Sequence, residues 1–207
     1  MYDLLIFDLD GTLIDSVGDI ADALNRTLGT SFDDSAVARM VGSGVHELLR
    51  RAGVTRDLDA TAARYRATYA QQPATRTSLY LGVKETLITL DQRGYELAIA
   101  TNKPGDLSRT ICDRLGIASL FSSVLGEDDV GAKKPDPLLV DLSRGKVGAP
   151  RSRTLYIGDS LVDADTADAA RVDLALVTYG YADPVQIAAR EAKYKVDRFA
   201  DLVRLLS

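Results

Sequence analysis

The sequence predicts an α/β protein in which an all-helical cap domain is inserted into a Rossmann-like, doubly wound parallel sheet. Three observations lead to this prediction. Short apolar runs alternate with helical stretches along most of the chain, which is typical of parallel sheets covered by helices. One long segment, residues 14 to 80, shows helical periodicity without a convincing strand. Several apolar runs end in polar residues, which suits ligand binding at the carboxyl edge of an open sheet.

The first apolar run, Leu4 to Phe7, leads directly into two acids, Asp8 and Asp10. Because side chains alternate along a strand, these two carboxylates are expected to emerge on one side of its carboxyl end. Gly11 then permits a sharp turn. Neighbouring carboxylates repel each other and are costly to bury, so the pair requires a proton or a counterion. A divalent metal ion would supply one.

The segment after this strand has amphipathic helical patterns, such as Ile20-Ala23-Leu24-Leu28 and Val45-Leu48-Leu49-Ala52. An insertion at this point would lie over the carboxyl edge of the sheet, where it could close over a site and exclude water. We therefore expect a cap domain at residues 15–80 and a core made of residues 1–14 and 81–207. The hinges are expected near residues 14–17 and 78–82.

The rest of the chain supplies the other strands and crossover helices of the predicted core. Further strands are expected at Glu96 to Ala100, Ser123 to Leu125, Thr154 to Ile157 and Leu174 to Val177. Helices are expected at Val83 to Gln92, Asp106 to Leu115, Pro137 to Arg144 and Ser160 to Ala170. This alternation is the basis for predicting a parallel sheet.

Polar residues follow two of the later elements. Thr101 and Asn102 come after the second core strand, where they suit a turn and helix start but could also bind a phosphoryl oxygen. Lys134 lies between Lys133 and Pro135, and the nearby prolines restrict where it points. A lysine pair is usually a solvated loop. If Lys134 instead reaches the carboxylates, it can neutralise them and bind transferring oxygens.

A fourth cluster follows the strand at residues 154–157, where Asp159 stands at the exit and Asp163 four residues on. Each acid alone is explained as a helix cap or as a partner of the helix dipole. Helix capping does not explain why two separate apolar strands both end in carboxylates, with a hydroxyl and a lysine near other strand ends. That conjunction predicts a site.

Composition limits the kind of protein. The 207 residues are 46% hydrophobic and 27% charged, and the net charge is −5 with scattered basic residues. This is typical of a globular protein and argues against nucleic acid as a partner. No apolar run approaches the roughly 20 residues that span a bilayer, so no membrane association is expected. The single Cys112 and the lack of a leader-like start favour the cytoplasm.

Taken together, the four clusters resemble the haloacid dehalogenase superfamily of phosphotransferases. The matching motifs are Asp8-Leu9-Asp10-Gly11-Thr12, Thr101, Lys134, and Gly158-Asp159 with Asp163. Each motif alone is weak, but all four in order at strand ends, with a helical insertion between the first two, are specific. The resemblance covers essentially the whole chain.

The resemblance implies Mg²⁺ held by Asp8, Asp159 and the backbone carbonyl of Asp10, with Asp163 behind these ligands or bridged by water. Hard cations such as Mg²⁺ select oxygen ligands. The resemblance also implies that Asp8 attacks phosphorus and forms an aspartyl-phosphate, while Asp10 carries protons as general acid and base. Lys134 would share in catalysis by offsetting charge on Asp8 and holding the phosphoryl group.

Further strings resemble the phosphoglycolate phosphatase branch: Thr101-Asn102-Lys103-Pro104, Gly42-Ser43-Gly44, Thr178-Tyr179-Gly180-Tyr181 and Val196 to Leu202. Leu81 and Arg171-Val172-Asp173 depart from the usual pattern of that branch. The implied reaction is hydrolysis of 2-phosphoglycolate to glycolate and phosphate, by a monomer or homodimer. Thr101, Asn102 and Lys134 are the expected phosphoryl contacts.

Substrate selection is expected in the cap, where backbone amides of Gly42 and Gly44 at a helix start could bind a carboxylate. A plain interhelix turn explains these glycines equally well. Other candidates in the cap are Arg39, Arg50, Arg51, Arg64, Arg66 and His46. For the arginines solvent exposure is the commoner outcome, and for the histidine a surface role is favoured.

Three alternatives stay open at this point. A β-phosphoglucomutase-like sugar phosphomutase shares the core motifs and the Asp10 acid. A phosphatase for another small metabolite or for pyrophosphate would share them too. A noncatalytic binding module on the same fold is disfavoured by the complete set of site residues.

Overall fold

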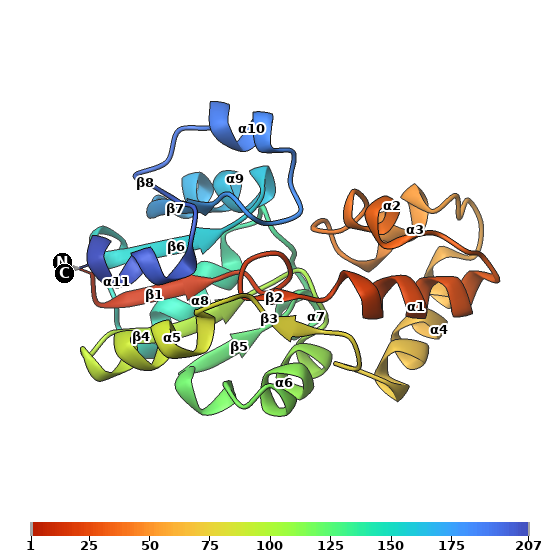
Figure 1. The fold of residues 1–207 in the computed structure, drawn as a ribbon, viewed down its shortest axis with the longest axis horizontal. Coiled ribbons are helices and arrows are strands. Elements are labelled where there is room, and N and C mark those ends of the chain that lie inside the picture. The colour runs from red at the N-terminus through yellow and green to blue at the C-terminus, as the bar shows by residue number, and fades with distance from the viewer. Residues whose placement is uncertain (1, 207) are drawn as a thin grey trace.

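The computed structural model describes residues 2–206 and has a six-stranded parallel sheet at its centre (Figure 1). The strands lie in the order β5-β4-β1-β6-β7-β8. They are β1 (Leu4–Phe7), β4 (Glu96–Ala100), β5 (Ser123–Leu125), β6 (Thr154–Gly158), β7 (Asp173–Val177) and β8 (Tyr194–Val196). The strand order reverses on either side of β1, so β1 is the topological switch point at which open α/β folds bind ligands.

The register brings the ends of three strands to one level. Phe7 of β1 is paired with Ile99 of β4 on one side and with Ile157 of β6 on the other. The residues that follow these strands therefore meet at the carboxyl edge of the sheet. This is where the candidate site residues lie.

Helices cover both faces of the sheet. One face packs against α5 (Val83–Gln92), α6 (Gly105–Arg114) and α11 (Leu202–Leu205), and the other against α8 (Leu138–Val147), α9 (Leu161–Ala170) and α10 (Pro184–Ala189). Short elements between them are α7 (Glu127–Val130), η1 (Ala118–Leu120), η2 (Arg151–Arg153) and η3 (Phe199–Asp201).

Side-chain alternation along β1 explains the two covered faces. Leu5 and Phe7 belong to one apolar cluster, whereas Leu4 and Ile6 belong to the other, and all four are fully buried. A strand buried on both faces reads as a continuous apolar run, as the sequence showed. The predicted α/β class with a doubly wound parallel sheet is thereby confirmed.

Four helices lie between β2 (Ile14–Asp15) and β3 (Ser78–Leu79), a short antiparallel pair. They are α1 (Val17–Leu28), α2 (Asp34–Ala38), α3 (Val45–Arg51) and α4 (Leu58–Gln71). Figure 1 shows them grouped beyond one edge of the sheet. We call residues 16–77 the helical insertion, and its status as a separate cap domain remains a proposal.

Three strands were not predicted from the sequence. The pair β2 and β3, at the predicted hinge positions, has two residues per strand, too few to show alternation. The edge strand β8 has three residues, and Tyr194, Lys195 and Val196 form no apolar run. Helix ends differ from prediction by up to three residues, the largest shift being at the end of α8. Among residues 2–206, no helix is both long and apolar enough to cross a membrane.

Candidate active site

Four predicted site residues converge at the carboxyl edge of the sheet. Asp8 follows β1, Thr101 follows β4 and Asp159 follows β6, while Lys134 comes from the loop between α7 and α8. All four are buried. The neighbouring positions of β4, β1 and β6 in the sheet are what bring these side chains together.

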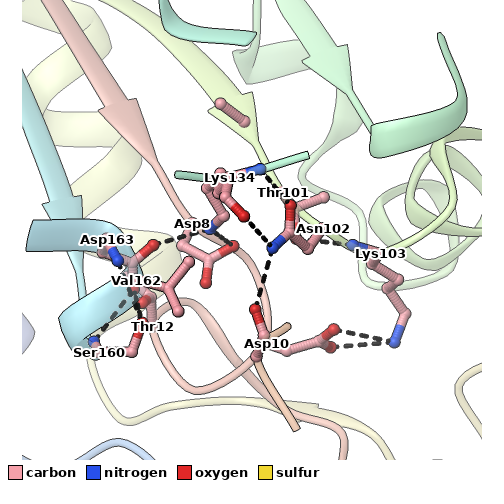
Figure 2. Close-up of polar contacts among 12 residues, drawn as sticks. Asp8, Asp10, Thr12, Thr101, Asn102, Lys103, Lys134, Ser160, Val162 and Asp163 are labelled. Carbon is pink, nitrogen blue, oxygen red and sulfur yellow. Dashed lines mark hydrogen bonds and ion pairs between the residues drawn. The ribbon is translucent and has the colours of Figure 1, made fainter. Parts of the chain in front are cut away.

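Asp8 is ion-paired with Lys134, whose Nζ lies 2.8 Å from Asp8 Oδ1 (Figure 2). The ammonium donates hydrogen bonds to Asp163 Oδ1 at 2.7 Å and to Tyr156 Oη at 3.0 Å. Asp8 Oδ1 is buried, and the Lys134 ammonium is its partner among the described residues. Burial raises the pKa of Asp8 to about 6, against the lowering effect of Lys134.

Lys134 stays charged in this setting. Burial alone would lower its pKa, but Asp163 and Asp8 together raise it well above the usual value. A buried lysine with two carboxylates around it is a fixed positive charge. It is placed to hold an anionic group beside Asp8.

Asp163 organises its neighbours. Its Oδ2 accepts hydrogen bonds from the backbone N–H of Asp159 at 3.1 Å and from the N–H and Oγ of Ser160 at 3.0 and 2.6 Å. Its Oδ1 accepts from Lys134 and Tyr156. Five donors leave little capacity for a metal bond. These contacts support the prediction that Asp163 lies behind the metal ligands or reaches the metal ion through water.

The donor set suits a hard cation. Oxygens of Asp8, Asp159 and Asp163 lie within 4.8 Å of one another, and all three side chains are buried. Burial, followed by the charges of Asp163 and Asp8, raises the pKa of Asp159 well above its usual value. Lys134 offsets only part of this negative charge. The three buried acids therefore fit a divalent metal ion.

Two glycines make room for Asp159. A Cβ on Gly11 or on Gly180 would collide with the Asp159 side chain. Gly11 also has a φ of +84°, which favours glycine. The turn after β1 thus approaches the end of β6 closely enough for Thr12 Oγ1 to donate a hydrogen bond to Asp159 Oδ1 at 3.2 Å.

Asp10 is held differently from Asp8. Its carboxylate accepts bonds from Lys103 Nζ at 3.0 and 3.2 Å and from Ser16 Oγ at 2.5 Å, and it does not join the three clustered acids. Both carboxylates border the same small cavity but have different partners, because β1 ends at Phe7 and strand alternation does not extend into the turn. Figure 2 shows the two carboxylates with separate lysine partners. The metal contact predicted for Asp10 is through its backbone carbonyl and not through this carboxylate.

Asn102 connects three segments. Its Nδ2 donates to the carbonyls of Gly42 at 3.1 Å and Lys134 at 3.2 Å, and its Oδ1 accepts from the Lys134 N–H at 2.7 Å. These contacts position Lys134 and reach the helical insertion. Thr101 Oγ1 accepts from the Lys103 N–H at 3.3 Å, so its own proton remains available to a ligand oxygen.

A small cavity of about 50 Å³ lies between the sheet edge and the helical insertion. From the core it is lined by Asp8, Asp10, Thr101, Asn102, Lys103, Pro104 and Leu107. From the insertion it is lined by Ile20, Val41, Gly42, Gly44, Val45, Leu48, Tyr65 and Tyr69. Of the predicted phosphoryl and carboxylate contacts, Thr101, Asn102, Gly42 and Gly44 thus border one cavity, and Lys134 does not line it.

None of the predicted arginines, nor His46, lines this cavity. Arg39 and Arg51 border a wider hollow of about 320 Å³ on the side of Asp159, and His46 Nε2 lies 2.9 Å from Asp59 Oδ1. Arg66 reaches across to the core, with its Nη2 3.1 Å from Glu127 Oε1. Arg50 pairs with Glu47, and Arg64 donates to Thr61.

Sequence reasoning missed Lys103 and Tyr181 as individual site residues. Lys103 stood in a string that we matched to the family, directly after Thr101 and Asn102. Tyr181 donates its backbone N–H to Asp159 Oδ2 at 2.8 Å, while its hydroxyl accepts from the N–H groups of Ser16 and Val17. Both residues lie in short sequence motifs that follow core strands, and this position is the signal that could have identified Lys103 and Tyr181.

A parallel sheet with buried acids and a threonine at its central strand ends, joined by a buried lysine from a loop, is the arrangement of a haloacid dehalogenase-like hydrolase. The model of that family, described as haloacid dehalogenase-like hydrolase, matches residues 5–177. This match covers well over half of the chain, which therefore belongs to the family.

Several similar proteins are named phosphoglycolate phosphatases. One from Pectobacterium atrosepticum is 38% identical over 98% of this chain and 91% of its own length. Another, from Rhodospirillum rubrum, is 38% identical over 96% of this chain and 88% of its own length. A crystal structure of a predicted phosphoglycolate phosphatase from Haemophilus somnus has a TM-score of 0.90 at 30% identity, covering 100% and 98% of the two chains. The prediction of a hydrolase similar to phosphoglycolate phosphatases is confirmed.

Proposed function

We propose that this protein is a Mg²⁺-dependent phosphatase that hydrolyses 2-phosphoglycolate to glycolate and phosphate through an aspartyl-phosphate. The observation that carries the proposal is the state of Asp8. It is buried, its Oδ1 lies 2.8 Å from the Lys134 ammonium, and it is clustered with the carboxylate of Asp159. A buried carboxylate held beside a fixed positive charge is suited to attack phosphorus.

Asp8, Asp159 and the backbone carbonyl of Asp10 would hold Mg²⁺, which when bound supplies charge that offsets the phosphoryl oxygens. Two side chains of the protein also stabilise the phosphoryl oxygens. Lys134 holds phosphoryl oxygens by charge, and Thr101 donates a hydrogen bond to one of them.

The first step takes place at Asp8. A carboxylate oxygen forms a bond to phosphorus in line with the ester oxygen, and the bond from phosphorus to that oxygen breaks. The second step is attack of water on the same phosphorus, which returns the free Asp8 carboxylate. Covalent catalysis of this kind divides one difficult displacement into two easier ones.

Asp10 moves the protons in both steps. It gives a proton to the departing glycolate oxygen and later takes one from the attacking water. Such positioned acid–base help is worth about 10²- to 10⁴-fold in rate. Asp10 and Asp8 border the same cavity, which supports this assignment.

The size of the cavity supports a small leaving group. A volume of about 50 Å³ holds a handful of water-sized groups, which suits glycolate better than a hexose. The relatives named phosphoglycolate phosphatase support the same substrate. No specific observation favours the sugar phosphomutase.

The test is phosphate release from 2-phosphoglycolate, glycerol phosphate, β-glucose 1-phosphate and pyrophosphate, in Mg²⁺ and in EDTA. We expect kcat/KM for 2-phosphoglycolate to exceed the others by about tenfold or more, and activity to be lost in EDTA. Isomerised glucose phosphate without phosphate release would indicate the mutase. No turnover of any ester would indicate the binding module.

We also propose a cytoplasmic location and a monomer or homodimer. Cell fractionation and light scattering on the purified protein test these two points. Recovery with membranes, or a higher oligomer, would contradict them.

A further inference from the structure

Lys103 is a buried cation that the proposed chemistry does not use. Its side chain is 3% exposed, and its Nζ contacts both carboxylate oxygens of Asp10 and the hydroxyl of Tyr69 at 3.1 Å. The ammonium also lies 4.6 Å from the centre of the Tyr69 ring. Residues of the core and of the helical insertion thus fix one lysine at the edge of the cavity.

Within residues 2–206, Lys103 is the only lysine, arginine or histidine that lines the small cavity. The other charged groups in its lining are Asp8 and Asp10, and the rest are apolar, hydroxyl or amide groups and glycines. An anionic organic group in this space would be repelled by the acids. Lys103 offers it the one compensating charge.

We propose that Lys103 binds the carboxylate of the substrate and thereby selects small phosphate esters that carry one. This inference deepens the proposed function and rests on it. The substrate carboxylate replaces Asp10 as the partner of Lys103, so the buried ammonium is paired both before and after binding.

The exchange also prepares Asp10 for its task. In the free protein, the Asp10 carboxylate is ion-paired with Lys103. Once the substrate carboxylate takes that place, the Asp10 side chain is released from the lysine and can face the leaving oxygen. An ester without a carboxylate leaves Asp10 on the lysine. Recognition of the leaving group and the position of Asp10 are therefore linked through one side chain.

The experiment compares two esters that differ only in the group of interest. One is 2-phosphoglycolate, and the other is 2-hydroxyethyl phosphate, which carries an alcohol in place of the carboxylate. Lys103→Met removes the charge with little change in length, Lys103→Arg keeps it, and Lys146→Met is a control at an exposed lysine of α8.

We expect Lys103→Met to lower kcat/KM for 2-phosphoglycolate by about 10- to 100-fold, the usual effect of losing a charged hydrogen-bond partner. For 2-hydroxyethyl phosphate the loss is expected to be within about threefold, since that ester makes no charged contact with the lysine. Lys103→Arg should keep most of the preference, and Lys146→Met should change neither value. Equal losses on both esters would overturn the proposal, because Lys103 would then act only through Asp10. Unchanged activity on both would overturn it as well.

A measurement on the wild-type protein keeps the test valid if Lys103→Met does not fold. Glycolate is expected to raise the melting temperature and to inhibit competitively, whereas ethylene glycol should do neither. Indifference to glycolate would count against the lysine as a carboxylate site.

Failure of the proposed function gives a different result. If the wild-type enzyme hydrolyses 2-phospholactate or 3-phosphoglycerate but not 2-phosphoglycolate, the substrate assignment fails and the role of Lys103 stands. If it hydrolyses neutral esters as well as carboxylated ones, the role of Lys103 fails although the protein is a phosphatase.

Discussion

At the scale of single residues, the burial of Asp8 decides most of the site's properties. The carboxylate is removed from water, and Lys134 compensates its charge only in part. The same burial that keeps water away from this carboxylate also makes its ionised form costly. Reactivity and instability thus have a common origin in this side chain.

Replacing the nucleophile tests the reaction directly. We expect Asp8→Asn to lower phosphate release by at least about 10³-fold, because an amide does not form the phosphoryl intermediate. Phosphate release in Mg²⁺ is the measurement, with circular dichroism to confirm folding. Near-normal activity in the variant would exclude Asp8 as the nucleophile.

The raised pKa of Asp8 predicts how metal-free stability depends on pH. The group has a pKa of about 6 in the fold against 3.8 for an ordinary aspartate, so the folded state binds its proton more tightly. The contribution of the Asp8 proton to the free energy of unfolding is complete below about pH 4 and is lost as the pH rises to about 6. Above that pH, Asp8 adds no further pH dependence. Asp159 shifts in the same direction.

Urea unfolding in EDTA measures this effect as the difference between wild type and Asp8→Asn. The variant is expected to gain roughly 1–3 kcal/mol over the wild type between pH 4 and pH 7. Excess Mg²⁺ should reduce the gain, since the cation offsets the buried charge. A constant difference across this pH range would contradict the assignment.

Gly11 offers a test of the turn that supports Asp159. Gly11→Ala and Gly29→Ala both place a side chain at positive φ, at a cost of about 1–2 kcal/mol each. A Cβ at Gly29 meets no atom within 4 Å, whereas one at Gly11 collides with the Asp159 carboxylate. Only Gly11→Ala is therefore expected to raise the Mg²⁺ concentration for half-maximal activity, by about tenfold. Equal behaviour of the two variants would show that the close approach is unimportant.

At the scale of elements, α1 begins without a cap from its own N-terminal residue. Ser16 makes no capping bond, and its Oγ donates to Asp10 instead. The hydroxyl of Tyr181 accepts from the N–H groups of Ser16 at 2.7 Å and Val17 at 3.1 Å, and donates to Asp15 Oδ1 at 2.9 Å. A tyrosine distant in sequence thus does the work of a helix cap.

Removing that hydroxyl should weaken the start of α1. We expect Tyr181→Phe to lower the free energy of unfolding by about 1–2 kcal/mol, the usual effect of losing a helix cap. Hydrogen exchange should quicken at the first turn of α1 more than in α9. The prediction is wrong if exchange in the two helices changes equally.

Helices and strands were predictable from the sequence where a local pattern of residues determined their position. The range of α5 was predicted in full, because Gly82 precedes it and its apolar spacing is regular. The site residues that follow β1, β4 and β6 were also predictable, since parallel strands end at one edge. The partner of Asp10 was not, because Lys103 is 93 residues away and only the tertiary fold brings it close.

At the scale of the whole molecule, several polar contacts connect the helical insertion to the core. Within residues 2–206 they include the ion pair of Arg66 with Glu127 and the bonds of Asn102 to the carbonyl of Gly42, of Lys103 to Tyr69 and of Arg114 to the carbonyl of Pro73. A Cβ at Gly44 would lie 2.5 Å from Glu127 Oε2, so the two parts approach closely there. This boundary encloses the small cavity.

Weakening the ion pair should open the cavity more often. Glu127→Gln is expected to speed hydrogen exchange in α3 and α4 by about three- to tenfold. Glu47→Gln is the control, since the partners of Glu47, Arg50 and Arg51, lie in its own helix α3. Faster exchange in both variants would mean that loss of any ion pair loosens the insertion.

Tyr181 has a consequence for how this protein can be recombined with its relatives. The residue belongs to the core by sequence, yet it holds the start of α1 and, through its backbone, the Asp159 carboxylate. Residues 16–77 grafted onto another core would arrive without that hydroxyl. A chimaera that exchanges the insertion must therefore carry the tyrosine segment as well.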